Sequence, residues 1–154
     1  KLARKHSVLT ILNPAPGRTL SKRVLKLCDF ITPNESEATL LTGIEVNDHS
    51  SAELAARKLQ NNGASSVIIT LGEQGALVLD KNGHVSNVKS FKLGPLVETT
   101  GAGDCFNGAL AVGIIRKMSL IEATKFACLA SSISVTRKGT AFSMPFMHEI
   151  KKMG

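Results

Sequence analysis

Apolar residues follow two different periods along the chain, and each period predicts one kind of element. Short runs that are almost entirely apolar are typical of buried strands, and the clearest is 66–71 (S-V-I-I-T-L). The other predicted strands cover residues 7–12, 29–32, 76–79 and 85–88, with a further short one near 91–93. Apolar residues three or four positions apart predict helices over residues 20–27, 35–42, 51–62, 103–117, 120–135 and 145–152. Strands alternating with helices favour right-handed βαβ units, so we expect an α/β fold with a parallel sheet.

Polar residues mark where two of these helices begin. Asn34 is a preferred helix-capping residue, and Glu37 three residues later completes the spacing of a capping box. Ser119 and Glu122 repeat this spacing at the start of the helix predicted over 120–135. Both starts are therefore predicted from local residues alone.

Four loops follow predicted strands and are rich in glycine, proline or small polar residues. They cover residues 13–17, 32–34, 72–75 and 99–103. In open α/β sheets, ligands bind beyond the carboxyl ends of the strands. The pattern therefore predicts one binding site built from these loops.

The loop with the most specific chemistry is the one that leads into the helix predicted over 103–117. Gly101 and Gly103 permit a sharp turn, and the free N–H groups of a first helical turn can hold an anion. Asp104 lies among those N–H groups, where it would repel phosphate unless it takes a proton from a hydroxyl during phosphoryl transfer. The alternative is an ordinary glycine-rich helix start, with Asp104 as a first-turn acid favoured by the helix dipole.

The composition narrows the classes of function. The chain has 154 residues, of which 43% are hydrophobic, which suffices for a folded core. Its net charge of +7 is spread over short clusters without a nucleic-acid motif, so a solvated basic surface is favoured over a nucleic-acid partner. No apolar run approaches the roughly 18 residues of a membrane span. Cys28, Cys105 and Cys128 form no CxxC pair, which favours a reducing compartment, the cytoplasm or the nucleus.

Several consecutive motifs resemble those of the ribokinase-like (PfkB) carbohydrate kinases. The stretch 99–109 (T-T-G-A-G-D-C-F-N-G-A) is similar to the C-terminal signature of that family, although Glu98 stands where the family usually has Asp. The other matching segments are N-P-A-P at 13–16, T-P-N-E-S-E-A at 32–38, L-T-G at 41–43, I-T-L-G at 69–72 and V-T-R-K-G at 135–139. The resemblance implies a three-layer α/β sandwich with a mostly parallel central sheet. It also implies ATP-dependent phosphorylation of a sugar hydroxyl, with the 5-hydroxyl of ribose as the first expectation.

The resemblance also implies roles for individual residues. Asp104 would be the catalytic base, and the anion hole for the γ-phosphate would be Gly101, Ala102 and Gly103. Asn34 would contact phosphate and Glu37 would hold Mg²⁺ through water, whereas a simple capping box is the alternative for that pair. The remaining ATP-binding positions would be Thr70, Gly72, Gly75 and Cys128, for which turn glycines and a core cysteine are the alternatives.

A monovalent-cation site, usually for K⁺, is a further implication of the resemblance. Its positions fall on Glu98, Thr100, Ser134, Gly139 and Ser143. Oxygen donors such as backbone carbonyls suit K⁺. Glu98 is one methylene longer than the usual Asp, so its carboxylate would reach a different position.

The chain begins without Met, and we expect it to be a C-terminal, nucleotide-binding part (residues 1–154) of a PfkB kinase truncated at the N-terminus. In the family, the N-terminal half carries most sugar-binding residues and the lid that forms the homodimer. We therefore expect ATP and a small sugar as partners of the complete protein, and little turnover by this chain alone. The alternatives are a PfkB kinase for another sugar or nucleoside, a non-catalytic nucleotide-binding fragment, and a basic nucleic-acid-binding domain.

Overall fold

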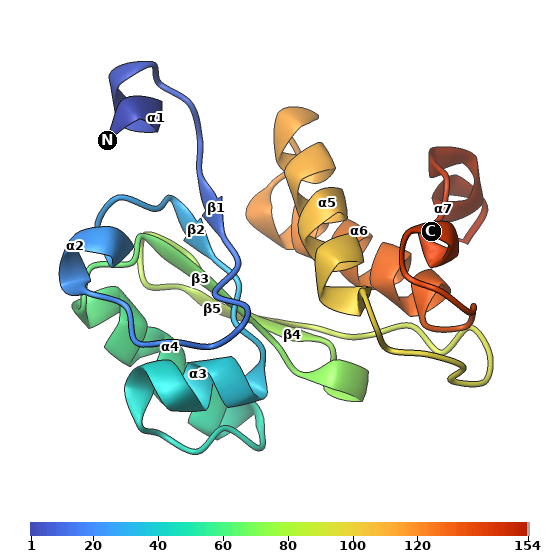
Figure 1. The fold of residues 1–154 in the computed structure, drawn as a ribbon, viewed down its shortest axis with the longest axis horizontal. Helices are drawn as coiled ribbons and strands as arrows, with labels where there is room; N and C mark the ends of the chain where they lie inside the picture. Colours follow the sequence, from blue (N-terminus) through green and yellow to red (C-terminus); the bar gives the residue numbers. More distant parts are fainter. Residues whose placement is uncertain (154) are drawn as a thin grey trace. The chain divides into compact units, whose positions relative to one another are not determined.

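Helices and strands are interspersed from Leu2 to Val88, and the elements between Val88 and Met153 are all helices (Figure 1). The computed structural model describes residues 1–153. The chain divides into two units, of which unit 1 comprises Lys1–Gly72 and Ala76–Asn87. Unit 2 comprises Glu73–Gly75 and the chain from Val88 onward.

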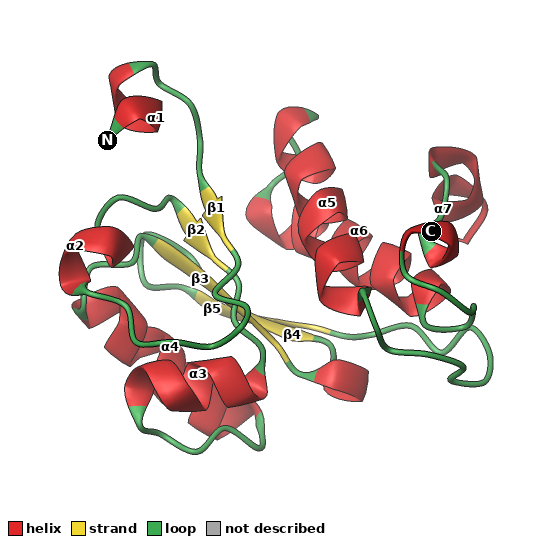
Figure 2. Ribbon diagram, viewed as in Figure 1, coloured by secondary structure: helices red, strands yellow, loops and turns green. Residues whose placement is uncertain are grey.

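The first 88 residues contain a five-stranded sheet (Figure 2). Its strands lie in the order of the sequence: β1 (Ile11–Leu12), β2 (Phe30–Ile31), β3 (Ser66–Thr70), β4 (Ala76–Leu79) and β5 (Val85–Val88). β1, β2 and β3 run parallel, whereas β4 pairs antiparallel with β3. The sheet is therefore mixed, with its parallel part at the β1 side.

The helices of unit 1 are α1 (Leu2–Lys5), α2 (Lys22–Leu25), α3 (Glu35–Thr42) and α4 (His49–Asn61). α3 and α4 pack against β3, and α4 also packs against β4. Alternate residues of the two strands, such as Val67 and Leu77, share one apolar core with Ala55 and Leu59 of α4. Val67, Ile68 and Ile69 are all fully buried, so β3 is covered on both faces, as its continuous apolar run predicts.

Unit 2 contains α5 (Ala102–Ile115), α6 (Leu120–Ser134) and α7 (Met147–Met153). α5 packs along α6, and α7 contacts α6. The two long helices approach closely at Gly113, where an added Cβ would lie 2.8 Å from the Cβ of Ala123. A glycine at this position therefore permits the close packing of α5 on α6.

The structure corrects several predicted boundaries. β1 covers two residues instead of 7–12, and Val8 and Leu9 before it are exposed. The strand expected near 91–93 is wrong, because the Phe91 N–H donates to the Ser132 hydroxyl of α6 and not to a neighbouring strand. α4 begins at His49, two residues earlier than predicted, because Asp48 caps it.

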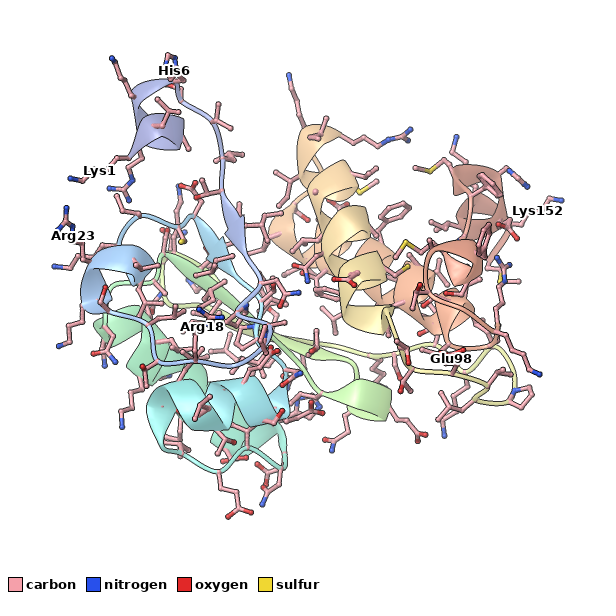
Figure 3. All side chains as sticks on the ribbon, viewed as in Figure 1. Lys1, His6, Arg18, Arg23, Glu98 and Lys152 are labelled. Carbon is pink, nitrogen blue, oxygen red and sulfur yellow. The ribbon has the colours of Figure 1, made fainter. Side chains whose placement is uncertain are left out.

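Some charged side chains near the helix ends point outward. Figure 3 shows Lys1 and Arg23 extending away from the ribbon of unit 1, and Lys152 doing so in unit 2. None of the helices between residues 1 and 153 combines the length and the apolar character that crossing a bilayer requires.

Candidate functional site

The turn before α5 depends on Gly101. This residue is the N-cap of α5 and has φ +82°, a left-handed conformation that favours glycine. A Cβ at this position would lie 3.3 Å from the Cβ and 3.4 Å from the Cα of Thr140. The backbone of residues 99–103 can therefore turn closely past a second loop that carries Thr140.

This turn leaves backbone donors free at the start of α5. The Ala102 N–H donates to the Thr99 carbonyl over 3.1 Å. The N–H groups of Gly101, Gly103 and Asp104 donate to no other atom within residues 1–153. Free N–H groups at the positive end of a helix dipole can hold an anion.

The Asp104 side chain is exposed and accepts no hydrogen bond within the described part of the chain. It follows Gly103 directly, so an unpaired carboxylate stands next to unpaired N–H donors. This arrangement can bind an anionic group and take a proton from a nearby hydroxyl. Asp104 does not cap the helix, because no side chain caps the start of α5.

A second loop, residues 135–143, lies against the turn before α5. The Gly139 N–H donates to Glu98 Oε2 over 2.8 Å, and the Val97 N–H donates to the Val135 carbonyl over 2.8 Å. Figure 3 labels Glu98 in the segment that leads to α5. The structure therefore joins Glu98 and Gly139, two residues of the predicted cation site.

The other predicted cation positions have contacts of their own. The Ser143 hydroxyl donates to the Thr140 carbonyl over 2.7 Å, next to Gly139. Ser134 is buried, and its carbonyl accepts from the Arg137 N–H over 3.1 Å. Thr100 is exposed. Within residues 1–153, Glu98 Oε1 accepts no hydrogen bond, so one carboxylate oxygen remains available and the donor set fits a monovalent cation.

The predicted residues of unit 1 gather at the start of α3. Asn34 and Glu37 form the predicted capping box: the Glu37 N–H donates to Asn34 Oδ1 over 2.8 Å, and the Asn34 N–H donates to Glu37 Oε2 over 2.9 Å. Asn34 also forms a parallel β-bridge with Thr70. Gly72 has φ +50°, and a Cβ there would lie 3.6 Å from Glu35 Oε1.

The capping interpretation of Asn34 and Glu37 is thus confirmed, and it occupies only one of the two carboxylate oxygens of Glu37. Glu37 is 8% exposed, and its Oε1 accepts no hydrogen bond within the described residues. The described part of the chain holds no cluster of three or more His, Cys, Asp or Glu side chains that could hold a metal ion. A single carboxylate fits Mg²⁺, which is commonly bound by one or two carboxylates together with substrate phosphates.

Gly75 and Cys128 have clear structural reasons for their identity. A Cβ at Gly75 would lie 2.0 Å from the Val88 carbonyl oxygen, so only glycine fits this close approach of two backbone segments. Cys128 is 5% exposed in α6, and burial raises the pKa of its thiol to about 12. These observations favour the turn glycine and the core cysteine that the sequence left as alternatives.

Some residues around the site were not predicted. Thr140 backs Gly101, and Arg137 forms an ion pair with Glu149 of α7, with Nη2 and Oε1 2.6 Å apart. The partners are far apart in the sequence, so neither a helical nor a strand period points to them. The R-K-G sequence at 137–139 was visible only as part of the family motif.

Residues 1–147 match the sequence model of a protein family, the pfkB family carbohydrate kinases. It is 42% identical over 149 residues to a ribokinase of Haemophilus influenzae, covering 97% of this chain and 48% of that protein. It is 37% identical over 153 residues to a deoxyribokinase of Salmonella typhi, covering 99% of this chain and 49% of that protein.

The fold is also similar to solved structures. The structure of Arabidopsis thaliana ribokinase complexed with ribose and ATP superposes with a TM-score of 0.91 and 29% identity, over 97% of this chain and 48% of that one. The predicted fold class is confirmed by this likeness. The chain spans about half the length of the relatives that it matches.

Proposed function

Because the chain belongs to the pfkB family of carbohydrate kinases, we propose that the complete protein transfers the γ-phosphoryl group of ATP to a sugar hydroxyl. D-ribose is the proposed acceptor and D-ribose 5-phosphate the product, which the similarity to a ribokinase at 42% identity supports. The observation that carries the proposal is the start of α5, where unpaired N–H groups adjoin the exposed, unpaired Asp104 carboxylate.

In the proposed reaction, Asp104 takes the proton of the sugar hydroxyl. The hydroxyl oxygen then forms a bond to the γ-phosphorus, while the bond from the γ-phosphorus to the β,γ-bridging oxygen breaks and releases ADP. The N–H groups of Gly101 and Gly103 donate to the oxygens of the phosphoryl group as its charge spreads. The Ala102 N–H would contribute only after leaving the Thr99 carbonyl.

The remaining residues are proposed to bind nucleotide and ions. Asn34 contacts phosphate, and Glu37 Oε1 holds water bound to Mg²⁺, an ion that offsets phosphate charge when bound. For K⁺, Glu98 Oε1 and the Ser143 hydroxyl would act with the carbonyls of Thr100, Ser134 and Gly139. Thr70 and Gly72 are the proposed nucleotide contacts of unit 1, and their closeness to Asn34 supports this role.

The test is ADP formation by the full-length protein with Mg-ATP and K⁺, with and without D-ribose. We expect ribose-dependent turnover, and Asp104→Asn should lower kcat by at least about 100-fold, because a positioned base typically contributes 10²–10⁴-fold. ATP affinity, measured by titration calorimetry, should stay nearly unchanged. Turnover that depends on 2-deoxyribose and not on ribose would reassign the substrate. A variant that keeps more than about a tenth of the wild-type kcat would contradict the role of Asp104.

A second candidate function concerns the 154 residues by themselves, because they span about half of the relatives. It is nucleotide binding without turnover. Titration of the isolated chain with ATP should then show binding, while saturating D-ribose produces no ADP. Ribose-dependent turnover by the isolated chain would overturn this second candidate.

Two further proposals concern the setting of the complete protein. A cytoplasmic location is supported by the three free cysteines, which suit a reducing compartment. A homodimer is proposed from the family resemblance, and its test is the molecular mass of the full-length protein in solution.

A further inference from the structure

Loop 135–143 packs against the turn before α5, and an ion pair between Arg137 and Glu149 connects this loop to α7. Arg137 Nη2 and Glu149 Oε1 are 2.6 Å apart, and Arg137 Nη1 and Glu149 Oε2 are 3.4 Å apart. The two side chains are 34% and 26% exposed. Such a two-point contact fixes direction as well as distance, which most exposed ion pairs do not.

Glu149 is itself held in place. Its Oε2 accepts the Phe146 N–H over 2.7 Å at the start of α7. The Arg137 guanidinium and this N–H together hold the pKa of the Glu149 carboxyl below its usual value, so the carboxylate stays charged near neutral pH. Glu149 therefore offers Arg137 a fixed partner.

Arg137 is connected to the turn before α5 through its neighbours. Two residues along, the Gly139 N–H holds the Glu98 carboxylate, and the next residue, Thr140, stands against Gly101.

We propose that Arg137 and Glu149 are positioning residues, which hold loop 135–143 against residues 98–101 and so fix the direction of the N–H groups at Gly101 and Gly103. This inference rests on the proposed function for its effect on catalysis, but the positioning itself does not. Neither side chain is proposed to touch a substrate. The alternative is an ion pair that only adds stability to α7.

Full-length Arg137→Gln separates these two roles. If the pair positions the turn, kcat falls by about 10- to 100-fold, since small misplacements of reacting groups have effects of this size. KM for the sugar changes by less than about twofold, because the loss is confined to the transition state. Arg137→Lys keeps the charge but lacks the two-pronged geometry, so we expect an intermediate loss of kcat.

A second measurement does not depend on catalysis. Amide hydrogen exchange of the peptide that covers residues 98–106 should become about tenfold faster in Arg137→Gln, as it does when a segment opens more often. The matched control is Arg57→Gln, which breaks the Arg57–Glu53 pair on α4, where Nη2 and Oε1 are 2.8 Å apart. The control should change neither kcat nor the exchange of this peptide.

The outcomes are distinguishable. If wild-type protein turns over and Arg137→Gln matches the control in kcat and in exchange, the inference is overturned and the proposed function stands. If wild-type protein shows no sugar-dependent turnover, the proposed function fails, and the exchange experiment alone decides the positioning role. Should Arg137→Gln not fold, Glu149→Gln, which keeps an acceptor for the Phe146 N–H, is judged by the same two readouts.

Discussion

Replacing Gly101 by alanine tests whether the turn before α5 has the shape that the proposed reaction needs. With φ +82°, an L-residue at this position carries a strain of about 1–2 kcal/mol. The new Cβ would also meet Thr140 at 3.3 Å, so that residue must shift by a few tenths of an ångström. The turn can either keep its conformation and the strain, or rotate and turn the Gly101 N–H away from the anion.

We therefore expect Gly101→Ala to lose stability, activity, or both. A strain of about 1–2 kcal/mol corresponds to a fall of about 2–8 °C in the thermal midpoint of a domain of 150–250 residues, and to a smaller fall in the longer full-length protein. Rotation would remove one donor of the anion hole, which typically lowers kcat by about 10²–10³-fold. The measurements are thermal unfolding and coupled ADP formation with the full-length protein.

Gly108→Ala is the matched control on the same helix. Gly108 is exposed, has an ordinary backbone conformation, and an added Cβ would meet nothing within 4 Å. Alanine is a better helix former than glycine by about 1 kcal/mol, so this variant should be slightly more stable and fully active. The reasoning is refuted if Gly101→Ala keeps both the wild-type midpoint and the wild-type kcat, or if Gly108→Ala loses as much.

Two more predictions concern unit 2. Gly113→Ala should lower the thermal midpoint, because overpacking against Ala123 costs about 1–3 kcal/mol and outweighs a helix-propensity gain of about 1 kcal/mol. A midpoint at or above that of Gly108→Ala would contradict this, because it would mean that α6 shifts to accommodate the added methyl group. Burial raises the pKa of Cys128 from 9.0 to about 12, so the thiol of the unfolded chain ionises at a lower pH than that of the folded chain. The free energy of unfolding should therefore fall as the pH rises from 9 to 12, by up to about 1.4 kcal/mol per pH unit. Urea unfolding of wild type and Cys128→Ala at pH 8 and pH 10 checks this, and equal slopes would contradict it.

The helix starts that were predicted correctly depend on residues close together in the sequence. The capping boxes at Asn34–Glu37 and Ser119–Glu122 are present as predicted, because both partners lie within one turn of the same helix. α4 shows the limit of this approach. Its capping box pairs Asp48 with Ser51, and a serine in the third helical position is not the usual signal.

Strand boundaries were predicted less well, because a strand exists only where a partner is in register. Val8 and Leu9 are as apolar as Ile11 and Leu12, yet β2 pairs with the latter two only. The same reason removes the strand expected near Phe91, whose N–H is taken by a side chain of α6. The antiparallel pairing of β3 with β4 also depends on contacts that no single run contains.

The candidate site was predicted in part. The glycine-rich turn and Asp104 follow from the residues themselves, whereas most other site residues came from the family motifs. The contacts of Gly139 with Glu98 and of Thr140 with Gly101 join two loops, one of which precedes α5 in the sequence while the other follows α6. Such contacts follow from tertiary packing, so a periodicity argument does not reach them.

The hydrogen bond between Glu98 and Gly139 has a consequence for the order of folding. It joins residues 41 positions apart and closes a loop that contains the whole α5–α6 hairpin. Since closure of long loops carries an entropic cost, the two helices can form before this bond does. A chain with its full helical content can therefore still lack a formed anion-binding turn. Far-UV circular dichroism would count such molecules as native, so the active fraction of a preparation has to be measured by ligand titration.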